Sequence, residues 1–230
     1  MDSNVYVQQF QFLLANNNGR FSLNWEDRYP ILNEDTSQTS FDAHYVYHPA
    51  WAARILAETK PAEHVDISGS LNFCTIVSAF IPVKFYDYRP APFHLSGLTS
   101  GRCDLMSLSF KDNSIESISC MHVIEHIGLG RYGDLLDLDG DLKAIKELKR
   151  VVKPGGNLLF VVPVGGKAKI MFNAHRIYQY HQVMEYFNDM SLMNYALCTD
   201  QGLFLNPGNE SETNNQNYGM GCWWFKKTSD

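Results

Sequence analysis

A short run of titratable residues, His122-Val123-Ile124-Glu125-His126, stands directly after a predicted strand. Carboxylate and imidazole groups commonly move protons in enzymes, so Glu125 and His126 are candidates for acid–base or positioning work on a substrate. The same residues fit the HxxEH zinc signature, which needs both histidines on one helix face. Gly128 and Gly130 follow at once and would break a helix, so we reject the zinc-protease interpretation.

Two aspartates, Asp87 and Asp104, can accept hydrogen bonds from ligand hydroxyl or amino groups. Asp87 follows the predicted strand VKFY, and Asp104 comes next to Cys103. Each also has a purely structural interpretation, because aspartate favours turns and helix caps. Both interpretations stay open from the sequence.

The elements that must position these residues are strands and helices in alternation. The run NLLFVVPV at 157–164 is apolar on both faces, which is typical of a parallel strand covered by helices on each side. Residues 114–121 are also predicted to form a strand. An amphipathic helix is predicted between these two strands, and it ends at Pro154-Gly155-Gly156. The apolar residues that recur at helical spacing are Leu142, Ile145, Leu148 and Val152.

A second predicted unit comes earlier, with a strand at 64–67, a helix near 72–80 and a strand at 83–86. We also expect a helix at 49–58 with Pro49 in its first turn, a helix at 177–187, strands at 192–198 and 218–225, and a mobile Asn-rich loop at 209–217. Tyr45, Tyr47 and His48 are interpreted as packing. Alternating strands and helices predict a doubly wound sheet, whose ligands bind beyond the carboxyl ends of the strands.

The segment from Asp104 to Val162 resembles the class I S-adenosylmethionine-dependent methyltransferases. It reads DLMSLSFKDNSIESISCMHVIEHIG and then DLKAIKELKRVVKPGGNLLFVVPV, close to the family order D-x-x-x-L-P-F-x-D-x-S-F-D, strand, E-H, and a helix ending L-K-P-G-G. A closer likeness is to a small uncharacterised methyltransferase-like family of nematodes and bacteria with HVIEHIGLGRYGD-type segments. The resemblance implies S-adenosylmethionine as cofactor, and we expect a small-molecule acceptor.

The resemblance also implies roles for particular residues. An acidic residue at the end of the second strand binds the ribose in this family, which points to Asp87, and Asp104 with Leu105 would meet the adenine. Glu125 or His126 would remove or direct the acceptor's proton. The expected cofactor contacts are Asp66, Gly69, Asp87, Asp104, Leu105 and His122.

The loop after the first strand departs from the family pattern D-x-G-x-G-x-G. It reads Asp66-Ile67-Ser68-Gly69-Ser70-Leu71-Asn72, with three small polar residues in place of the expected glycines. These residue types can still form such a loop, since Asn tolerates positive φ. A rival interpretation is a methyltransferase-like binding or scaffold module without the cofactor, and another keeps a different nucleotide in the same crevice.

A metal site is a further alternative from the resemblance. In small-RNA 2′-O-methyltransferases and ubiquinone-pathway O-methyltransferases, an ExxEH segment at this place binds a divalent ion. Here His122 replaces the first Glu, while Glu125, His126 and a downstream His175 are present. A metal would lower the pKa of a hydroxyl nucleophile. The replaced glutamate alters the ligand set, so we assign no metal ligands.

Composition excludes several classes of protein. With 45% hydrophobic residues, the chain of 230 residues has material for a sizeable core, and its net charge of −6 argues against nucleic acid as a main partner. The five cysteines form no CxxC pair, which is typical of free thiols in a reducing compartment. No signal peptide or membrane span is apparent, so we expect a soluble cytoplasmic protein.

We therefore predict one domain over residues 1–230, with a cap or lid at 1–48 and a core at 49–230. Its expected fold is α/β and Rossmann-like, a doubly wound, mostly parallel, seven-stranded sheet with an antiparallel last strand. The antiparallel part is implied by the resemblance.

Overall fold

The computed structural model describes residues 2–229, which form two units divided between Phe41 and Asp42. The first unit holds helix α1 (Ser3–Ala15) and a single 3-10 turn η1 (Trp25–Asp27). Helix α1 begins at Asp2, whose side chain accepts a hydrogen bond from Asn4 N, and none of its residues is buried. The assignment of residues 1–48 as a cap or lid stays a prediction.

The second unit is built on an eight-stranded sheet in the order β3-β2-β1-β4-β5-β10-β8-β9. Strands β1 to β5 run parallel, and β10, β8 and β9 each pair antiparallel. The strands are β1 (His64–Ser68), β2 (Val83–Asp87), β3 (Leu98–Arg102), β4 (Ile115–Met121), β5 (Val152–Val164), β8 (Met190–Cys198), β9 (Phe204–Leu205) and β10 (Gly219–Lys227). The predicted doubly wound, mostly parallel sheet is confirmed, and the two-residue β9 brings it to eight strands rather than seven.

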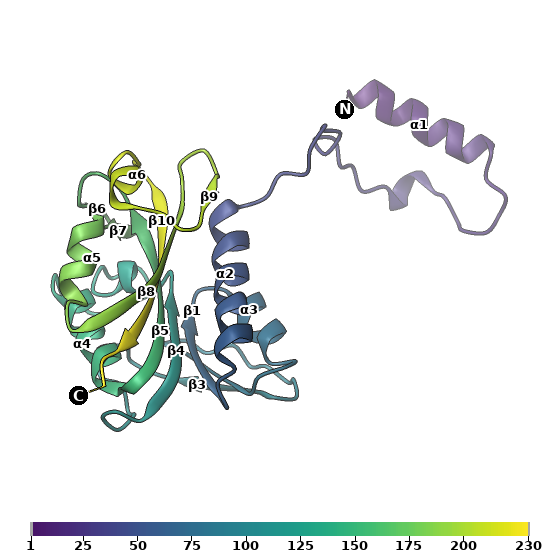
Figure 1. Cartoon of the computed structure of the whole chain (residues 1–230). Coiled ribbons are helices and arrows are strands. Elements are labelled where there is room, and N and C mark those ends of the chain that lie inside the picture. The colour runs from purple at the N-terminus through teal and green to yellow at the C-terminus, as the bar shows by residue number, and fades with distance from the viewer. Residues whose placement is uncertain (1, 230) are drawn as a thin grey trace. The chain divides into compact units, whose positions relative to one another are not determined.

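Helices cover both faces of this sheet, as Figure 1 shows. Helices α2 (Ala43–Thr59) and α3 (Leu71–Val77) pack on one face, and α4 (Gly140–Val151) and α5 (Tyr180–Tyr186) pack on the other. Each face has its own core of buried apolar side chains. The chain passes from β1 to β2 and β3 on one side and returns to β4 on the other side of β1, which makes β1 and β4 the switch point of the topology.

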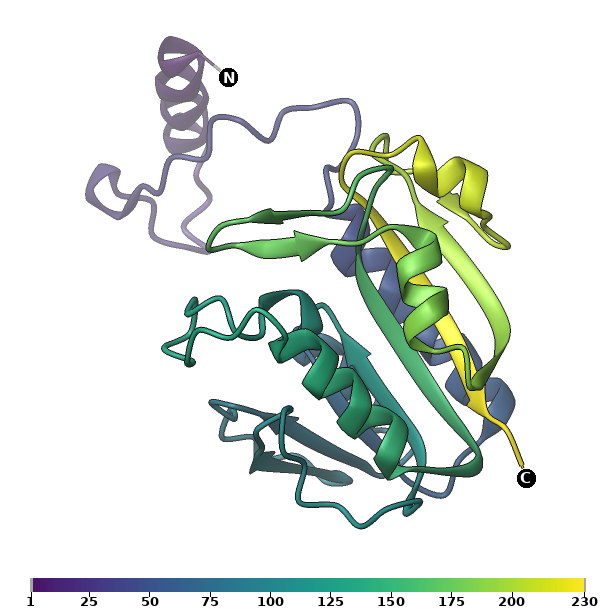
Figure 2. The same cartoon turned by 90° about the vertical axis from the view of Figure 1, so that its left-hand side faces the viewer.

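A small hairpin and a short helix complete the second unit. The hairpin of β6 (Lys169–Met171) and β7 (His175–Ile177) projects from the same side of the sheet as the loop before α4 (Figure 2). Helix α6 (Glu210–Asn214) forms within the stretch 209–217, for which the sequence predicted a loop. Its first turn is closed by Asn209, whose side chain accepts a hydrogen bond from Glu212 N. A local cap therefore orders this polar segment.

Several element boundaries predicted from the sequence are wrong. Helix α2 begins at Ala43 because Asp42 caps it, accepting a hydrogen bond from Tyr45 N, and Pro49 lies inside the helix rather than in its first turn. Strand β5 begins at Val152 directly after α4, so Val152 and Pro154-Gly155-Gly156 belong to the strand. Val152 pairs with Ile115, and the register shifts between Ile115 and Ser117, which accommodates the glycines.

Residue 177 also lies in β7 rather than in the helix predicted at 177–187, which is shortened to α5. All five cysteines are free thiols, and only Cys103 is partly exposed. Within residues 2–229, no helix combines the length and the apolar character needed to cross a membrane.

Candidate functional site

A cavity of about 330 Å³ lies at the carboxyl ends of β1, β2 and β4, where the topology switches. Its volume is in the range of small-molecule sites, and we call it the carboxyl-end cavity. Six of the eight predicted site residues line it, and Asp66 and Glu125 do not. The six are Gly69, Asp87, Asp104, Leu105, His122 and His126.

Asp87 is the last residue of β2, and its carboxylate is held in place by its own turn. One oxygen, Oδ1, accepts a hydrogen bond from Arg89 N at 2.6 Å. The other oxygen accepts none from the described residues. The turn-forming interpretation of Asp87 is therefore correct, and the same turn leaves a carboxylate oxygen available at the cavity wall.

The segment after β3 forms the adjoining wall. Cys103 N donates to Asp87 O, which ties this segment to the end of β2. Asp104 Oδ1 accepts a hydrogen bond from Met106 N at 2.9 Å, so Asp104 closes a turn as its structural interpretation required. Leu105 is buried in the core while it also lines the cavity. Contact of Asp104 and Leu105 with an adenine stays a prediction.

The loop after β1 passes very close to the end of β4. Gly69 N donates to Met121 O at 2.9 Å, and a side chain at Gly69 would place its Cβ 3.1 Å from His122 O. Ser68 stands where the family has its first glycine, and its hydroxyl donates to Asp66 Oδ2 at 2.9 Å. Since Ser68 turns inward, this replacement adds no side chain to the cavity lining.

Asp66 belongs to a buried polar network between β1 and β4. Its carboxyl accepts hydrogen bonds from Ser68 and Ser119, and the two ring nitrogens of His64 contact Ser117 Oγ and Ser119 Oγ at 2.8 and 2.9 Å. Burial raises the pKa of Asp66 to about 7 and lowers that of His64 to about 3. The structure therefore places Asp66 beneath the loop, apart from the other candidates, and its direct contact with a cofactor stays a prediction.

The residues after β4 bring the predicted acid–base pair together. Residues Ile124–His126 form a single 3-10 turn, η2, rather than the helix that an HxxEH zinc site needs. Glu125 Oε1 lies 2.9 Å from His122 Nδ1 and 3.8 Å from His126 Nε2. His126 Nδ1 lies 2.6 Å from Ala174 O in the turn between β6 and β7. One buried carboxylate oxygen thus stands between two imidazoles that line the cavity.

Burial sets the protonation of this group. It raises the pKa of Glu125 to about 7, against the smaller opposing influence of His126. It lowers the pKa of His122 to about 4, and burial also lowers that of His126. A carboxyl whose pKa lies near neutrality can both take up and release a proton, which is what acid–base work requires.

Helix α2 supplies Tyr45 and His48, which the sequence analysis interpreted as packing, and His44, which it did not single out. His44 and Tyr45 stack on the ring of His122 with centroids 5.7 and 5.4 Å away, and His48 meets it edge-on at 5.1 Å. The ring of Tyr218, just before β10, is tilted against that of His44 at 5.3 Å and stacks on that of His175 at 5.0 Å. The spacing of residues 44, 45 and 48 on one helix was a usable signal, but nothing in the sequence indicated that they face His122.

The metal alternative receives no support from the arrangement of side chains. Among residues 2–229, no three His, Cys, Asp or Glu side chains are placed to hold a metal ion. His175 lies with its ring centroid 6.4 Å from that of His126 and stacks on Tyr218 at 5.0 Å.

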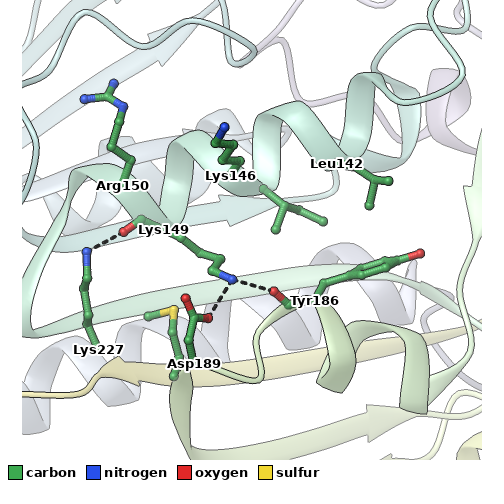
Figure 3. A pocket seen from close by; sticks show the side chains of 9 residues that line it. Leu142, Lys146, Lys149, Arg150, Tyr186, Asp189 and Lys227 are labelled. Atoms are coloured by element: carbon green, nitrogen blue, oxygen red, sulfur yellow. Dashed lines mark hydrogen bonds and ion pairs between the residues drawn. The ribbon is translucent and has the colours of Figure 1, made fainter.

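A second cavity, of about 470 Å³, lies at the opposite end of the sheet. Lys227, which lines it, donates to Asn113 just before β4, so this amino-end cavity lies by the amino ends of β4 and β5. Lys149 Nζ lies 2.6 Å from Asp189 Oδ1 and donates to Tyr186 O at 2.9 Å, and both contacts are drawn in Figure 3. The lining residues are Leu142, Ile145, Lys146, Lys149, Arg150, Tyr186, Asp189, Met190 and Lys227.

One protein family is similar to part of this chain in sequence. A family described as Caenorhabditis protein of unknown function, DUF268, matches residues 106–201. This match spans every element from β4 to β8, including η2, α4, β5, the β6–β7 hairpin and α5. No curated protein is similar enough in sequence to be matched.

Several solved structures are similar in three dimensions. The Burkholderia thailandensis 1,6-didemethyltoxoflavin-N1-methyltransferase, bound to 1,6-didemethyltoxoflavin and S-adenosylhomocysteine, has a TM-score of 0.58 at 11% identity over 80% of this chain and 79% of its own. The N-methyltransferase NodS of Bradyrhizobium japonicum WM9, with S-adenosyl-L-homocysteine, has 0.52 at 13% over 96% and 98%. The [4+2]-cyclase SpnF has 0.51 at 14% over 78% and 82%. The chain therefore has the class I methyltransferase fold.

Proposed function

We propose that this protein is an S-adenosylmethionine-dependent methyltransferase that acts on a small-molecule acceptor. The observation that carries the proposal is the carboxyl-end cavity, which sits at the switch point of the sheet and has an available Asp87 carboxylate oxygen in its wall. The fold alone does not decide the reaction, since a cyclase shares it. We extend the proposal to a cytoplasmic protein without a nucleic-acid partner, as its composition predicts.

The residues around the cavity fit such a cofactor. Asp87 Oδ2 would accept hydrogen bonds from the two ribose hydroxyls, while Oδ1 stays bound to Arg89 N and keeps the carboxylate oriented. Asp104 and Leu105, on the adjoining wall, would meet the adenine edge. Gly69 keeps the loop after β1 free of a side chain where it approaches β4. When bound, the cofactor would supply a methyl group on a positively charged sulfur.

The chain's own part in the reaction is to hold the acceptor and manage its proton. His122 and His126 line the cavity, and Glu125 lies between them, so an acceptor atom placed there would be near a proton-accepting carboxylate. Because burial brings the pKa of Glu125 to about 7, this carboxylate can take the acceptor's proton at neutral pH. His126, whose ring is held by its contact with Ala174 O, would position the acceptor.

Calorimetric titration with S-adenosylmethionine and S-adenosylhomocysteine tests the proposal. We expect micromolar binding by the wild-type chain and a loss of roughly tenfold to 100-fold in Asp87→Ala, because a ligand hydrogen bond to a charged group contributes about 1.5–3 kcal/mol. Asp139→Ala is the matched control, since Asp139 is exposed and its side chain does not cap α4. Equal affinity in Asp87→Ala would show that the ribose contact is misplaced.

One observation favours a rival function, a binding or scaffold module that does not use the cofactor. The loop from Ser68 to Asn72 lacks the three glycines of the family pattern. The inward turn of Ser68 toward Asp66 weakens this rival, because this replacement adds no side chain to the cavity lining. The same titration decides between the two: a folded protein that binds neither ligand would be a module of this kind.

A further inference from the structure

Five of the chain's eight histidines gather around Glu125, and we call them the histidine cluster: His44, His48, His122, His126 and His175. Four buried side-chain nitrogen or oxygen atoms in residues 2–229 lack a hydrogen-bond partner, and three belong to this group. They are His48 Nε2, His122 Nε2 and Glu125 Oε2. Unpartnered buried polar atoms are rare and costly, so their concentration at one place indicates a ligand-binding function.

Backbone carbonyls decide which ring nitrogens carry protons. His48 Nδ1 lies 2.7 Å from His44 O, and His126 Nδ1 lies 2.6 Å from Ala174 O. A carbonyl oxygen only accepts, so each Nδ1 carries the proton and each Nε2 is a bare acceptor when the ring is neutral. Burial lowers the pKa of both rings, that of His48 to about 3, so both are neutral at pH 7.

Arg131 also lies close to His126 but does not change which of its ring nitrogens carries the proton. Its Nη1 lies 3.3 Å from His126 Nδ1 and 3.1 Å from Ala174 O. If His126 Nδ1 were an acceptor, its lone pair would face the carbonyl lone pairs at 2.6 Å, which is repulsive. Arg131 and His126 therefore both donate to Ala174 O, and His126 Nε2 remains an acceptor.

His122 completes an acceptor-rich wall. Its Nδ1 lies 2.9 Å from Glu125 Oε1, and when Glu125 is ionised this nitrogen must donate, which leaves His122 Nε2 bare. His122 Nε2, His126 Nε2 and the Glu125 carboxylate then all offer lone pairs. His122 and His126 line the carboxyl-end cavity, and the buried His122 Nε2 and Glu125 carboxylate lie directly behind this wall.

From this arrangement we infer that the methyl acceptor is a primary or secondary amine, which enters as an ammonium ion and is held by the acceptors of His122, Glu125 and His126. An ammonium supplies the hydrogen-bond donors that these atoms lack, and its charge pairs with the Glu125 carboxylate. The aromatic rings of Tyr45 and Tyr218 around the cluster also favour a cation. At this wall a carboxylate or phosphate would instead meet lone pairs and the like charge of Glu125. The nearby cations face elsewhere, since Arg89 lies over the Tyr132 ring and Arg131 reaches the Nδ1 side of His126.

This inference rests on the proposed function, and the chemistry balances within it. The ammonium first gives a proton to Glu125, which frees the nitrogen lone pair. That lone pair then forms a bond to the methyl carbon of the sulfonium donor, and the carbon–sulfur bond breaks with its electron pair left on sulfur. The secondary or tertiary ammonium that results can lose a further proton to solvent.

Three probes of matched size test the inference: benzylamine, benzyl alcohol and benzoate. Each is titrated into the full chain, with and without S-adenosylhomocysteine, while the histidine Cε1–Hε1 signals are followed by NMR. We expect benzylamine to shift the His122 and His126 signals and to bind at least about tenfold tighter than benzyl alcohol, with no shift from benzoate. Benzoate binding as tight as that of benzylamine, or no shift from benzylamine, would overturn the inference.

Glu125→Gln should weaken benzylamine binding at least about tenfold, because it removes the charge and keeps the side-chain volume. Glu185→Gln, at an exposed position on α5, should leave it unchanged. If Glu125→Gln does not fold, the imidazole ¹⁵N chemical shifts of the wild-type chain test the inference instead, because they report which ring nitrogens carry a proton. Bare Nε2 atoms on His48 and His126 support the inference, and protonated Nε2 atoms contradict it.

The two proposals fail separately. Absence of S-adenosylhomocysteine binding in calorimetry would remove the methyltransferase function itself. Binding of S-adenosylhomocysteine together with the wrong probe preference would leave the methyltransferase function in place and overturn only the amine.

Discussion

Two cavities at opposite ends of one sheet differ in how their charged groups are used. The amino-end cavity is larger, about 470 Å³ against about 330 Å³, yet most of its charged groups already have partners. Lys149 pairs with Asp189, and Arg150 pairs with Glu147 and Asp112. In and behind the carboxyl-end cavity, an Asp87 oxygen and the acceptors of Glu125 and His122 are unpartnered. Available polar atoms, rather than volume, distinguish a binding site from a groove between packed elements.

Substitutions that fill one cavity or the other should differ most in their effect on ligand affinity. Gly69→Val places new carbon atoms against His122 O, which a Cβ alone would approach to 3.1 Å. Because Gly69 lines the cavity, a bound ligand would compete with the new side chain for space, and overpacking of this kind costs about 1–3 kcal/mol. We therefore expect affinity for S-adenosylhomocysteine to fall by up to about 100-fold in calorimetry. Leu142→Trp, which fills the amino-end cavity, should leave that affinity unchanged. Unchanged affinity in a folded Gly69→Val chain would contradict the assigned site.

The pH dependence of stability should report the buried carboxyl of Glu125. Its pKa is raised from 4.5 to about 7 on folding, so the folded state holds a proton that the unfolded state releases. Glu125 therefore costs stability as pH rises from about 4.5 to 7, by up to about 1.4 kcal/mol per pH unit. Glutamine does not titrate, so this cost is absent from the Glu125→Gln variant. As the pH rises from about 4.5 to 7, its free energy of unfolding in urea should increase relative to that of wild type by up to about the same amount per pH unit.

Glu185→Gln provides the matched control for this measurement, since Glu185 is exposed and its stability difference from wild type should not vary with pH. A Glu125→Gln difference that stays constant between pH 5 and 7 would mean that Glu125 is ionised throughout that range, contrary to its buried position.

Arg150→Met should separate stability from ligand binding. The guanidinium of Arg150 donates to Leu108 O and Phe110 O and so ties the segment before β4 to α4. Without it those carbonyls lose their partner, and we expect the melting temperature to drop by several degrees. Affinity for S-adenosylhomocysteine should stay within about twofold of wild type, because the amino-end cavity is not the binding site. Lost binding at an unchanged melting temperature would reverse the roles of the two cavities.

Lys146→Ala should have the smallest effect of the series. Lys146 lines the amino-end cavity, and no ion pair to it is found among the described residues. We expect a stability change within about 0.5 kcal/mol, measured by thermal unfolding with and without millimolar inorganic phosphate. Stabilisation by phosphate that disappears in Lys146→Ala would identify the amino-end cavity as an anion site.

The sequence predicted the central strands because burial on both faces leaves a clear signature, as in the run at 157–164 that became most of β5. It missed β3, a short edge strand with the sequence LTSGR, because edge strands need little apolar character. It also missed the β6–β7 hairpin. Pro154-Gly155-Gly156 misled the prediction of where β5 begins, because a bulge accommodates those residues within the strand.

The candidate site was predictable where chain order determines position. Asp87 and His122 lie at the ends of predicted strands whose carboxyl ends meet at one edge, and both line one cavity. Asp104 lines the same cavity, but its place came from the family resemblance, because the strand before it was missed. The sequence could not show that Asp66 lies apart from them, because its buried position involves a hydrogen bond from Ser119, which faces β1 from β4. The contact of α2 with His122 depends on how a distant helix packs on the sheet. No local pattern encodes that packing.

Hydrogen–deuterium exchange with and without S-adenosylhomocysteine tests most directly that the ligand binds in the carboxyl-end cavity. We predict protection in peptides that contain residues 67–70, 87–89, 103–106 and 122–126, and no change in peptides that contain 146–150 and 186–190. Protection at α4 and α5, or protection nowhere in a folded chain, would contradict the account.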